Sequence, residues 1–249
     1  MEIQKEIYNS HIKLIRTLND TFIFVEQCFS YLEIQITDWE TSQDETDYAY
    51  KVPAIKSKSK SAFRTEKEIA QIFNRFVDYE LFESFLTVIV SKFESYLFLC
   101  LSSVFKKYPQ KLTIKVQEIK ITSDIDINII LSTSEYTSII DKIIENRISS
   151  ISYGTPKQYW KYFLTITGFE IDETMINKYI ELKATRDLII HNNSIVNNLY
   201  IEKSGNEART RSGRIPINYE YFEQSIGLLK KLSGSISREA KTKYKERNT

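Results

Sequence analysis

The segment 186–193 reads RDLIIHNN and brings a guanidinium, a carboxylate and an imidazole together in eight residues. On a helix, Asp187 and His191 lie four positions apart and share a face, so the carboxylate can accept a hydrogen bond from one imidazole nitrogen. Arg186 lies about 140° from His191 around an ideal helix. Arginine is long, however, and the helix is expected to end at the Asn pair. Both heads can therefore converge on a groove beside the C-terminal end of the helix.

A guanidinium and an imidazole are sufficient for the cleavage of RNA by its own 2′-hydroxyl group. The substrate supplies the nucleophile, so neither a serine nor a cysteine is needed. His191 would act as general acid or base, a contribution of roughly 10²- to 10⁴-fold, and Arg186 would bind the scissile phosphate. The expected products are a 2′,3′-cyclic phosphate and a 5′-hydroxyl, formed without a metal or other cofactor. DNA lacks the 2′-hydroxyl and should not be cut.

The same spacing also has an ordinary structural interpretation. His191 would then lie near the negative end of a helix dipole, with Asn192 and Asn193 as C-terminal capping residues. The other histidine, His11, has no acid or cysteine at catalytic spacing, and a structural role is expected for it. The spacing alone leaves both interpretations of segment 186–193 open.

Composition indicates what kind of domain positions these groups. Hydrophobic residues make up 42% and charged residues 27% of the 249-residue chain, with only 6 Gly and 4 Pro, which favours a helix-rich folded domain. The net charge of +1 gives no general affinity for nucleic acid or membranes. The two cysteines, Cys28 and Cys100, indicate neither a disulfide scaffold nor a zinc finger, and we expect a cytoplasmic protein. The N-terminus has no apolar signal-peptide core.

Apolar residues at spacings of three and four predict a single all-α bundle, residues 1–249, with long N-terminal and C-terminal helices. The strongest pattern covers 79–108 and is stopped by Pro109. Its most apolar part, 82–101, contains three charged residues, which favours a buried helix over a membrane span. The first helix is predicted over about 9–36. N-capping residues are expected to begin the later helices at Ser134, Thr155, Asp172 and Asn218.

Three regions are less regular. Residues 38–62 contain an acidic run followed by a basic run, and we expect an exposed or disordered linker; an arm that binds a partner or nucleic acid is the alternative. Residues 111–131 alternate in places and predict either two short strands or irregular connectors. Residues 203–249 form a basic C-terminal loop and helix, with 11 Lys and Arg against 5 Glu, a local excess of +6.

That basic excess can hold a phosphate backbone or can simply keep a terminal helix soluble. If it binds RNA, the three arginines of the loop between residues 205 and 214 are the expected contacts. They are Arg209, Arg211 and Arg214.

Two stretches together resemble a known family. The phrase RDLIIHNN is similar to the R-x4-H motif of the HEPN superfamily of ribonucleases, and the pair KFESYLFLCLSSVFKKYPQKL and RDLIIHNNSIVNNLY resembles its RiboL-PSP-HEPN branch. The resemblance covers roughly residues 82–200. One departure is Ser194, where relatives often carry glycine, and we expect it to affect only a turn.

The resemblance implies catalytic roles for Arg186 and His191, with Asp187 as the polar residue after the arginine. It implies supporting roles for Asn192 and for Glu94 of the central helix. It also implies a homodimer with a composite cleft, a toxin or effector role in bacterial defence against phage, and control by a regulatory partner such as an antitoxin, a nucleotidyltransferase or a sensor ATPase. A non-catalytic HEPN module that binds a protein or RNA is the alternative.

Overall fold

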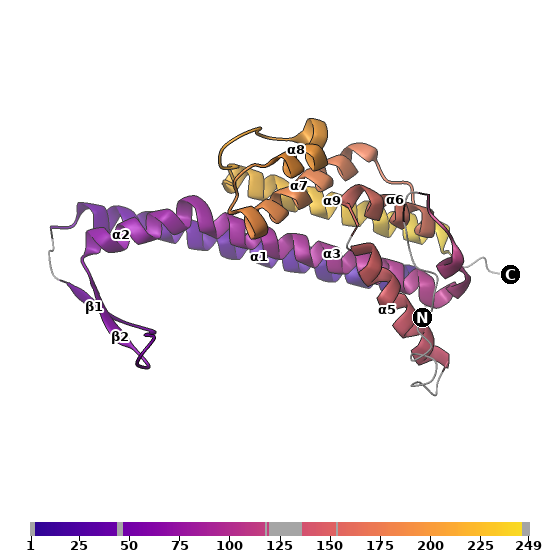
Figure 1. Ribbon diagram of the computed structural model, residues 1–249, viewed down its shortest axis with the longest axis horizontal. Helices are drawn as coiled ribbons and strands as arrows, with labels where there is room; N and C mark the ends of the chain where they lie inside the picture. Colours follow the sequence, from indigo (N-terminus) through magenta and orange to yellow (C-terminus); the bar gives the residue numbers. More distant parts are fainter. Residues whose placement is uncertain (1–2, 44–46, 118, 120–135, 153, 246–249) are drawn as a thin grey trace.

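Two long antiparallel helical segments form the frame of the molecule (Figure 1). The computed structural model describes residues 3–43, 47–117, 119, 136–152 and 154–245. Over these residues the chain is mostly helical, which confirms the all-α prediction. The helices are α1 (Ile3–Thr41), α2 (Glu66–Arg75), α3 (Leu81–Lys107), α5 (Tyr136–Ser152), α6 (Pro156–Thr167), α7 (Glu173–Asn192), α8 (Asn198–Ser204) and α9 (Tyr219–Lys243).

The first segment of the frame is α1, and the second runs through α2 and α3. A π-helical turn, η1 (Phe76–Glu80), joins α2 to α3 without a break in the helix. Two short 3₁₀ turns, η2 (Pro109–Thr113) and η3 (Gly205–Glu207), follow α3 and α8. Both chain ends lie at the same end of the molecule, and α2 lies at the other (Figure 1).

Helix α3 is the centre of the core because it is apolar on most of its circumference. All seven residues of its predicted apolar stripe are buried: Phe82, Leu86, Ile89, Phe93, Leu97, Cys100 and Val104. By length and composition the segment Glu66–Lys107 could cross a membrane, but 56% of its most apolar window is buried inside the protein. It is therefore the core helix of a bundle, against which α1, α5, α7 and α9 pack.

Three predicted capping residues begin their helices as expected. Thr155 and Gln158 form a reciprocal capping box ahead of Pro156, and Asp172 accepts a hydrogen bond from the Thr174 amide at 2.7 Å. Asn218 caps α9 in the same way, through the Tyr221 amide. Ser134 lies outside the described residues. These caps set where α6, α7 and α9 begin, and so fix the register of α7 against α3.

The region predicted as a linker contains an antiparallel hairpin. Strand β1 (Tyr48–Val52) pairs with β2 (Lys60–Arg64), and Tyr48 lies opposite Arg64. The side chains of this region are mostly exposed, in agreement with an exposed linker, but residues 48–52 and 60–64 form paired strands that the sequence did not predict. Period-two alternation is weak here because no face of the hairpin is buried, so the sequence carried little signal for strands.

Near residue 112 the chain forms an irregular connector, one of the two predicted alternatives. Leu112 lies in the 3₁₀ turn η2 and is buried, so the short strand considered there does not form. Pro109 opens this turn with its fixed φ angle, and an isolated strand would have had no sheet to join. The second alternating run, residues 125–129, lies outside the described residues.

His11 joins the two terminal helices. Its Nδ1 lies 3.1 Å from the Ser233 hydroxyl of α9 in a hydrogen bond, and Arg238 is close. Burial first, and the Arg238 guanidinium second, lower the pKa of the His11 imidazole below its ordinary value of 6.5. The folded protein therefore holds this imidazole neutral.

We expect acidification to weaken the α1–α9 contact through His11. As the pH falls through about 6.5, the unfolded chain takes up the proton before the folded protein does, so the free energy of unfolding decreases. Between about pH 7.5 and 5.5 this decrease should be smaller in His11→Gln than in the parent, as measured by urea unfolding. An equal decrease in both proteins would contradict the assignment.

Candidate functional site

Helix α7 carries Arg186, Asp187 and His191 in its last two turns. The helix ends at Asn192, and Asn193 follows as the C-cap in the left-handed conformation, with φ of 48°. The Asn192 side chain donates to the Ile195 carbonyl and so stabilises the turn. The predicted helix end is confirmed, and His191 lies in the final turn as the sequence indicated.

The Arg186 guanidinium is held between two carboxylates. Its Nη2 donates to Glu94 Oε2 of α3 at 2.7 Å, and its Nη1 donates to Asp187 Oδ1 at 3.0 Å. Its Nε is buried and has no hydrogen-bond partner among the described residues. Glu94 thus contacts Arg186 directly, and the central helix α3 positions the Arg186 guanidinium.

Two lysines complete the cluster. Lys183 lies 2.8 Å from Glu94 Oε1 and 3.3 Å from Asp187 Oδ1, and Lys203 of α8 lies 3.3 Å from Asp187 Oδ2. The cluster therefore holds three cations and two carboxylates, an excess of one positive charge. The side chains are each about one fifth exposed, so solvent screens these pairs only in part.

His191 differs from the predicted arrangement. The Asp187 carboxylate accepts hydrogen bonds from Lys183, Arg186 and Lys203. His191 makes no hydrogen bond or ion pair with any residue that the structure describes. The expected Asp187–His191 hydrogen bond is therefore absent from this part of the chain. Three cations within reach attract the carboxylate more strongly than a neutral imidazole does. The imidazole remains exposed to solvent.

The cluster and the imidazole nevertheless share one side of α7. Lys183, Asp187 and His191 follow each other at intervals of four residues, so they form a row along the helix. Three apolar side chains that are close in sequence to the end of α7 are exposed: Ile190, Ile195 and Leu199. The arrangement can attract an anion to the cations and can exchange protons at the exposed imidazole.

A second network of hydrogen bonds stabilises the turn that follows α7. Ser194, with φ of 61°, is buried and donates its hydroxyl to Glu83 Oε1 of α3 at 2.8 Å. The left-handed conformation favours glycine, and this hydrogen bond holds the serine there. Arg214 Nη2 also donates to Glu83, its Nη1 donates to the Asn193 carbonyl at 3.2 Å, and its guanidinium lies over the ring of Tyr79. Arg214 thus holds the turn after α7 in place, and its expected RNA contact stays a prediction.

Arg209 is also engaged inside the protein. Its Nε donates to the buried Glu181 carboxylate at 3.0 Å, and its guanidinium lies 3.4 Å from the ring centroid of Tyr221. Glu181 also accepts hydrogen bonds from Thr185, Tyr200 and Tyr221. A buried carboxylate binds a nearby guanidinium firmly, so Arg209 is held against α7, and its expected RNA contact stays a prediction.

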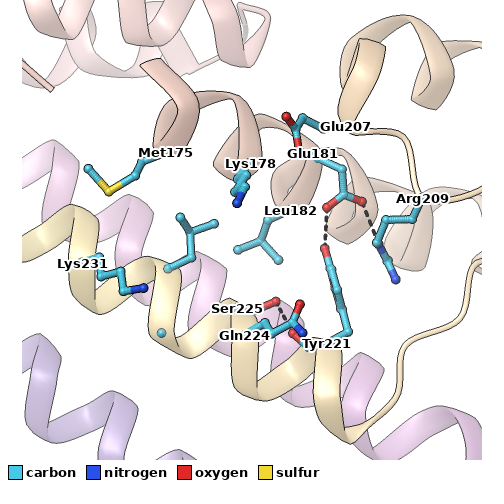
Figure 2. A pocket seen from close by; sticks show the side chains of 12 residues that line it. Met175, Lys178, Glu181, Leu182, Glu207, Arg209, Tyr221, Gln224, Ser225 and Lys231 are labelled. Carbon is cyan, nitrogen blue, oxygen red and sulfur yellow. Dashed lines mark hydrogen bonds and ion pairs between the residues drawn. The ribbon is translucent and has the colours of Figure 1, made fainter. Parts of the chain in front are cut away.

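Burial and the Glu181 anion raise the pKa of the Tyr221 hydroxyl well above its ordinary value. Tyr221 therefore stays protonated and donates to Glu181 at 2.8 Å. Figure 2 shows this tyrosine and Arg209 converging on Glu181 at the edge of a surface pocket of about 460 Å³ between α7 and α9. Neither Arg186 nor His191 lines this pocket, so it is separate from the row on α7.

Only Arg211 of the three predicted arginines is exposed without a polar partner among the described residues. In the same part of the chain, no group of three or more His, Cys, Asp and Glu residues has the geometry to hold a metal ion.

Comparisons with known proteins leave the resemblance to rest on its motifs: no family model matches the chain, and no curated protein or solved structure gives a significant match.

Sequence reasoning missed Lys183, Lys203 and Glu181. Lys183 had a signal, since it stands four residues before Asp187 on the same helix. Lys203 belongs to the next helix, and only the chain reversal after Asn193 brings it to Asp187.

We expect Arg209→Ala to lower the free energy of unfolding by about 3 kcal/mol, because Glu181 would remain buried without its cation. Arg211→Ala, a matched arginine of the same loop, should change it by less than about 0.5 kcal/mol. Urea unfolding of the two variants measures the difference. A loss in Arg209→Ala no larger than in Arg211→Ala would show that the network adds no stability.

Proposed function

We propose that this protein is a metal-independent endoribonuclease that uses the row on α7. The single observation that carries the proposal is the exposed His191 imidazole on the same side of α7 as Lys183 and as Asp187, whose carboxylate holds three cations. In this mechanism the RNA 2′-hydroxyl attacks the adjacent phosphorus atom, and the P–O5′ bond breaks. The products are a 2′,3′-cyclic phosphate and a 5′-hydroxyl.

His191 exchanges the proton in this reaction, either by taking it from the 2′-hydroxyl or by giving it to the departing 5′-oxygen. Nη1 and Nη2 of Arg186 each carry two N–H groups. One N–H of each donates to Asp187 or Glu94, and the other donates to the phosphate and stabilises its negative charge. Lys183 and Lys203 add positive charge beside it. Asp187 acts as an anchor for these cations rather than as a partner of the histidine.

Partial exposure of the Arg186 head supports binding of a phosphate from the solvent side, but its two carboxylate partners also support a second candidate. In a non-catalytic helical module, the pairing of Arg186 with Glu94 would simply brace α7 against α3. His191 is exposed and has no polar partner among the described residues. This favours the enzyme, because an ion pair with a purely structural role does not need a histidine beside it.

We expect His191→Ala to reduce RNA cleavage by roughly 10²- to 10⁴-fold without changing the melting temperature, because the imidazole is exposed. The matched control is His11→Gln, which alters the other histidine and should keep full activity. Cleavage of a labelled RNA in EDTA, with analysis of the ends, measures this. An RNA with 2′-deoxy nucleotides throughout should remain intact.

Cleavage that survives His191→Ala, or that stops in EDTA, would contradict the mechanism. If no RNA is cut by the parent while Arg186→Ala lowers the free energy of unfolding, the second candidate is correct.

The proposal includes a homodimer in the cytoplasm whose two α7 ends face one cleft. Exposed Ile190, Ile195 and Leu199 support it, because exposed apolar side chains near a charged site suit an interface core with a polar rim. By resemblance, the protein would act as a toxin or effector in bacterial phage defence. Free nuclease activity harms its host, so an antitoxin, a nucleotidyltransferase or a sensor ATPase would restrain it.

We expect Ile190→Asp to convert a dimer to a monomer and to reduce cleavage at least tenfold, because a charge in the interface core has no partner. Light scattering after gel filtration measures the mass. Val88→Asp, which alters another exposed apolar residue, should leave both properties unchanged. A parent protein that is already monomeric and active would contradict the composite cleft.

A further inference from the structure

The β1–β2 hairpin projects from the end of the helical frame that lies away from the two chain ends (Figure 1). A two-stranded sheet without a packed layer contributes little stability of its own. Its side chains are therefore not dictated by the core, and their chemistry has to be explained by something else.

The hairpin is rich in cations and exposed rings. Between residues 48 and 64 the sequence contains five basic residues and no acidic one: Lys51, Lys56, Lys58, Lys60 and Arg64. All five are exposed, and no ion pair joins them to any residue that the structure describes. The acidic run lies before the hairpin, at residues 38–47, so the two signs of charge are segregated along the chain.

Rings and cations lie side by side on the sheet. Alternation and register place Tyr48, Tyr50, Arg64 and Lys60 on one face. Tyr50 is 45% exposed, and the Tyr48 hydroxyl donates to Glu66, which orients that ring at the base of the hairpin. Phe63, 55% exposed, lies on the opposite face beside Lys51.

Stacking rings flanked by cations bind single-stranded nucleic acid, because every base has a π-face and every nucleotide carries a phosphate. We propose that the β1–β2 hairpin is a binding site for single-stranded RNA, with Tyr50 stacking on a base and Lys51, Lys60 and Arg64 contacting phosphates. The inference rests on the proposed function for its choice of RNA over other polyanions.

The position of the hairpin fits a strand that reaches the row on α7. Residues 66–83 form one unbroken helical path from β2 to Glu83, about 27 Å at 1.5 Å per residue. Glu83 contacts Ser194 just past the end of α7. Arg64 and Arg75 also line a pocket of about 410 Å³ at the base of the hairpin, where Glu68 offsets one of the two positive charges.

The test is fluorescence anisotropy of a labelled 20-nucleotide oligouridine RNA with full-length His191→Ala protein, which leaves the RNA uncut. A charge variant changes Lys51, Lys58, Lys60 and Arg64 to Ala. A control variant changes four exposed lysines outside the hairpin to Ala: Lys5, Lys13, Lys107 and Lys157. We expect the charge variant to bind at least tenfold more weakly than the control variant. Its slope of log affinity against log salt should also be shallower by up to about 3.

A second pair of variants tests the ring. Tyr50→Ala should weaken binding by roughly fivefold or more, as the loss of one stacked base predicts, whereas Tyr50→Phe should stay within about twofold of the parent. Thermal melting checks that all variants fold, which the peripheral position of the hairpin favours. Equal affinity of the charge and control variants, or of Tyr50→Ala and Tyr50→Phe, would overturn the proposal.

Two further outcomes separate this inference from the proposed function. RNA binding through the hairpin by a parent protein that cuts no RNA would leave the site intact and reject the nuclease. Cleavage that is unaffected by the charge variant, together with its unchanged RNA affinity, would leave the nuclease intact and reject the site. Loss of binding only to anionic phosphatidylserine vesicles, with RNA affinity unchanged, would identify a membrane contact instead and also reject it.

Discussion

The contact on which the candidate site depends is the ion pair between Glu94 of α3 and Arg186 of α7. It joins the central helix of the bundle to the helix that carries the candidate chemistry, and it fixes a guanidinium whose Nε is already buried. Without a carboxylate on α3, this head would carry an unbalanced charge in a partly buried place. The orientation of Lys183 depends on the same carboxylate, since its Nζ lies 2.8 Å from Glu94.

The bundle repeats this arrangement. Glu83 of α3 receives Arg214 and Ser194, and Glu181 of α7 receives Arg209, Thr185, Tyr200 and Tyr221. Each acid is largely buried, and each accepts hydrogen bonds from donors in other parts of the chain. Such networks are costly when incomplete, so they fix one register of α3, α7 and the loop before α9. Two basic residues of that loop, Arg209 and Arg214, therefore hold it against the bundle.

The sequence predicted what depends on local pattern and missed what depends on chain reversal. The α3 stripe, the stop at Pro109 and the caps Thr155, Asp172 and Asn218 follow from periodicity and capping chemistry, and the structure confirms them. Charge counting, in contrast, cannot tell a free arginine from one that has a buried acid opposite it. The ion pairs of Arg209 and Arg214 could not be predicted, because Glu181 and Glu83 lie 28 and 131 positions away in sequence.

The same reasoning applies within the row on α7. An interval of four residues predicted that Asp187 would bind His191, yet the interval is shared by Lys183 on the other side of the carboxylate. Lys203 arrives from α8 and takes the remaining oxygen. The carboxylate holds three cations in place, and no hydrogen bond joins it to the imidazole in the part of the chain that the structure describes. The histidine is thus free to turn toward a ligand, and the structural role of Asp187 is what leaves His191 available for chemistry.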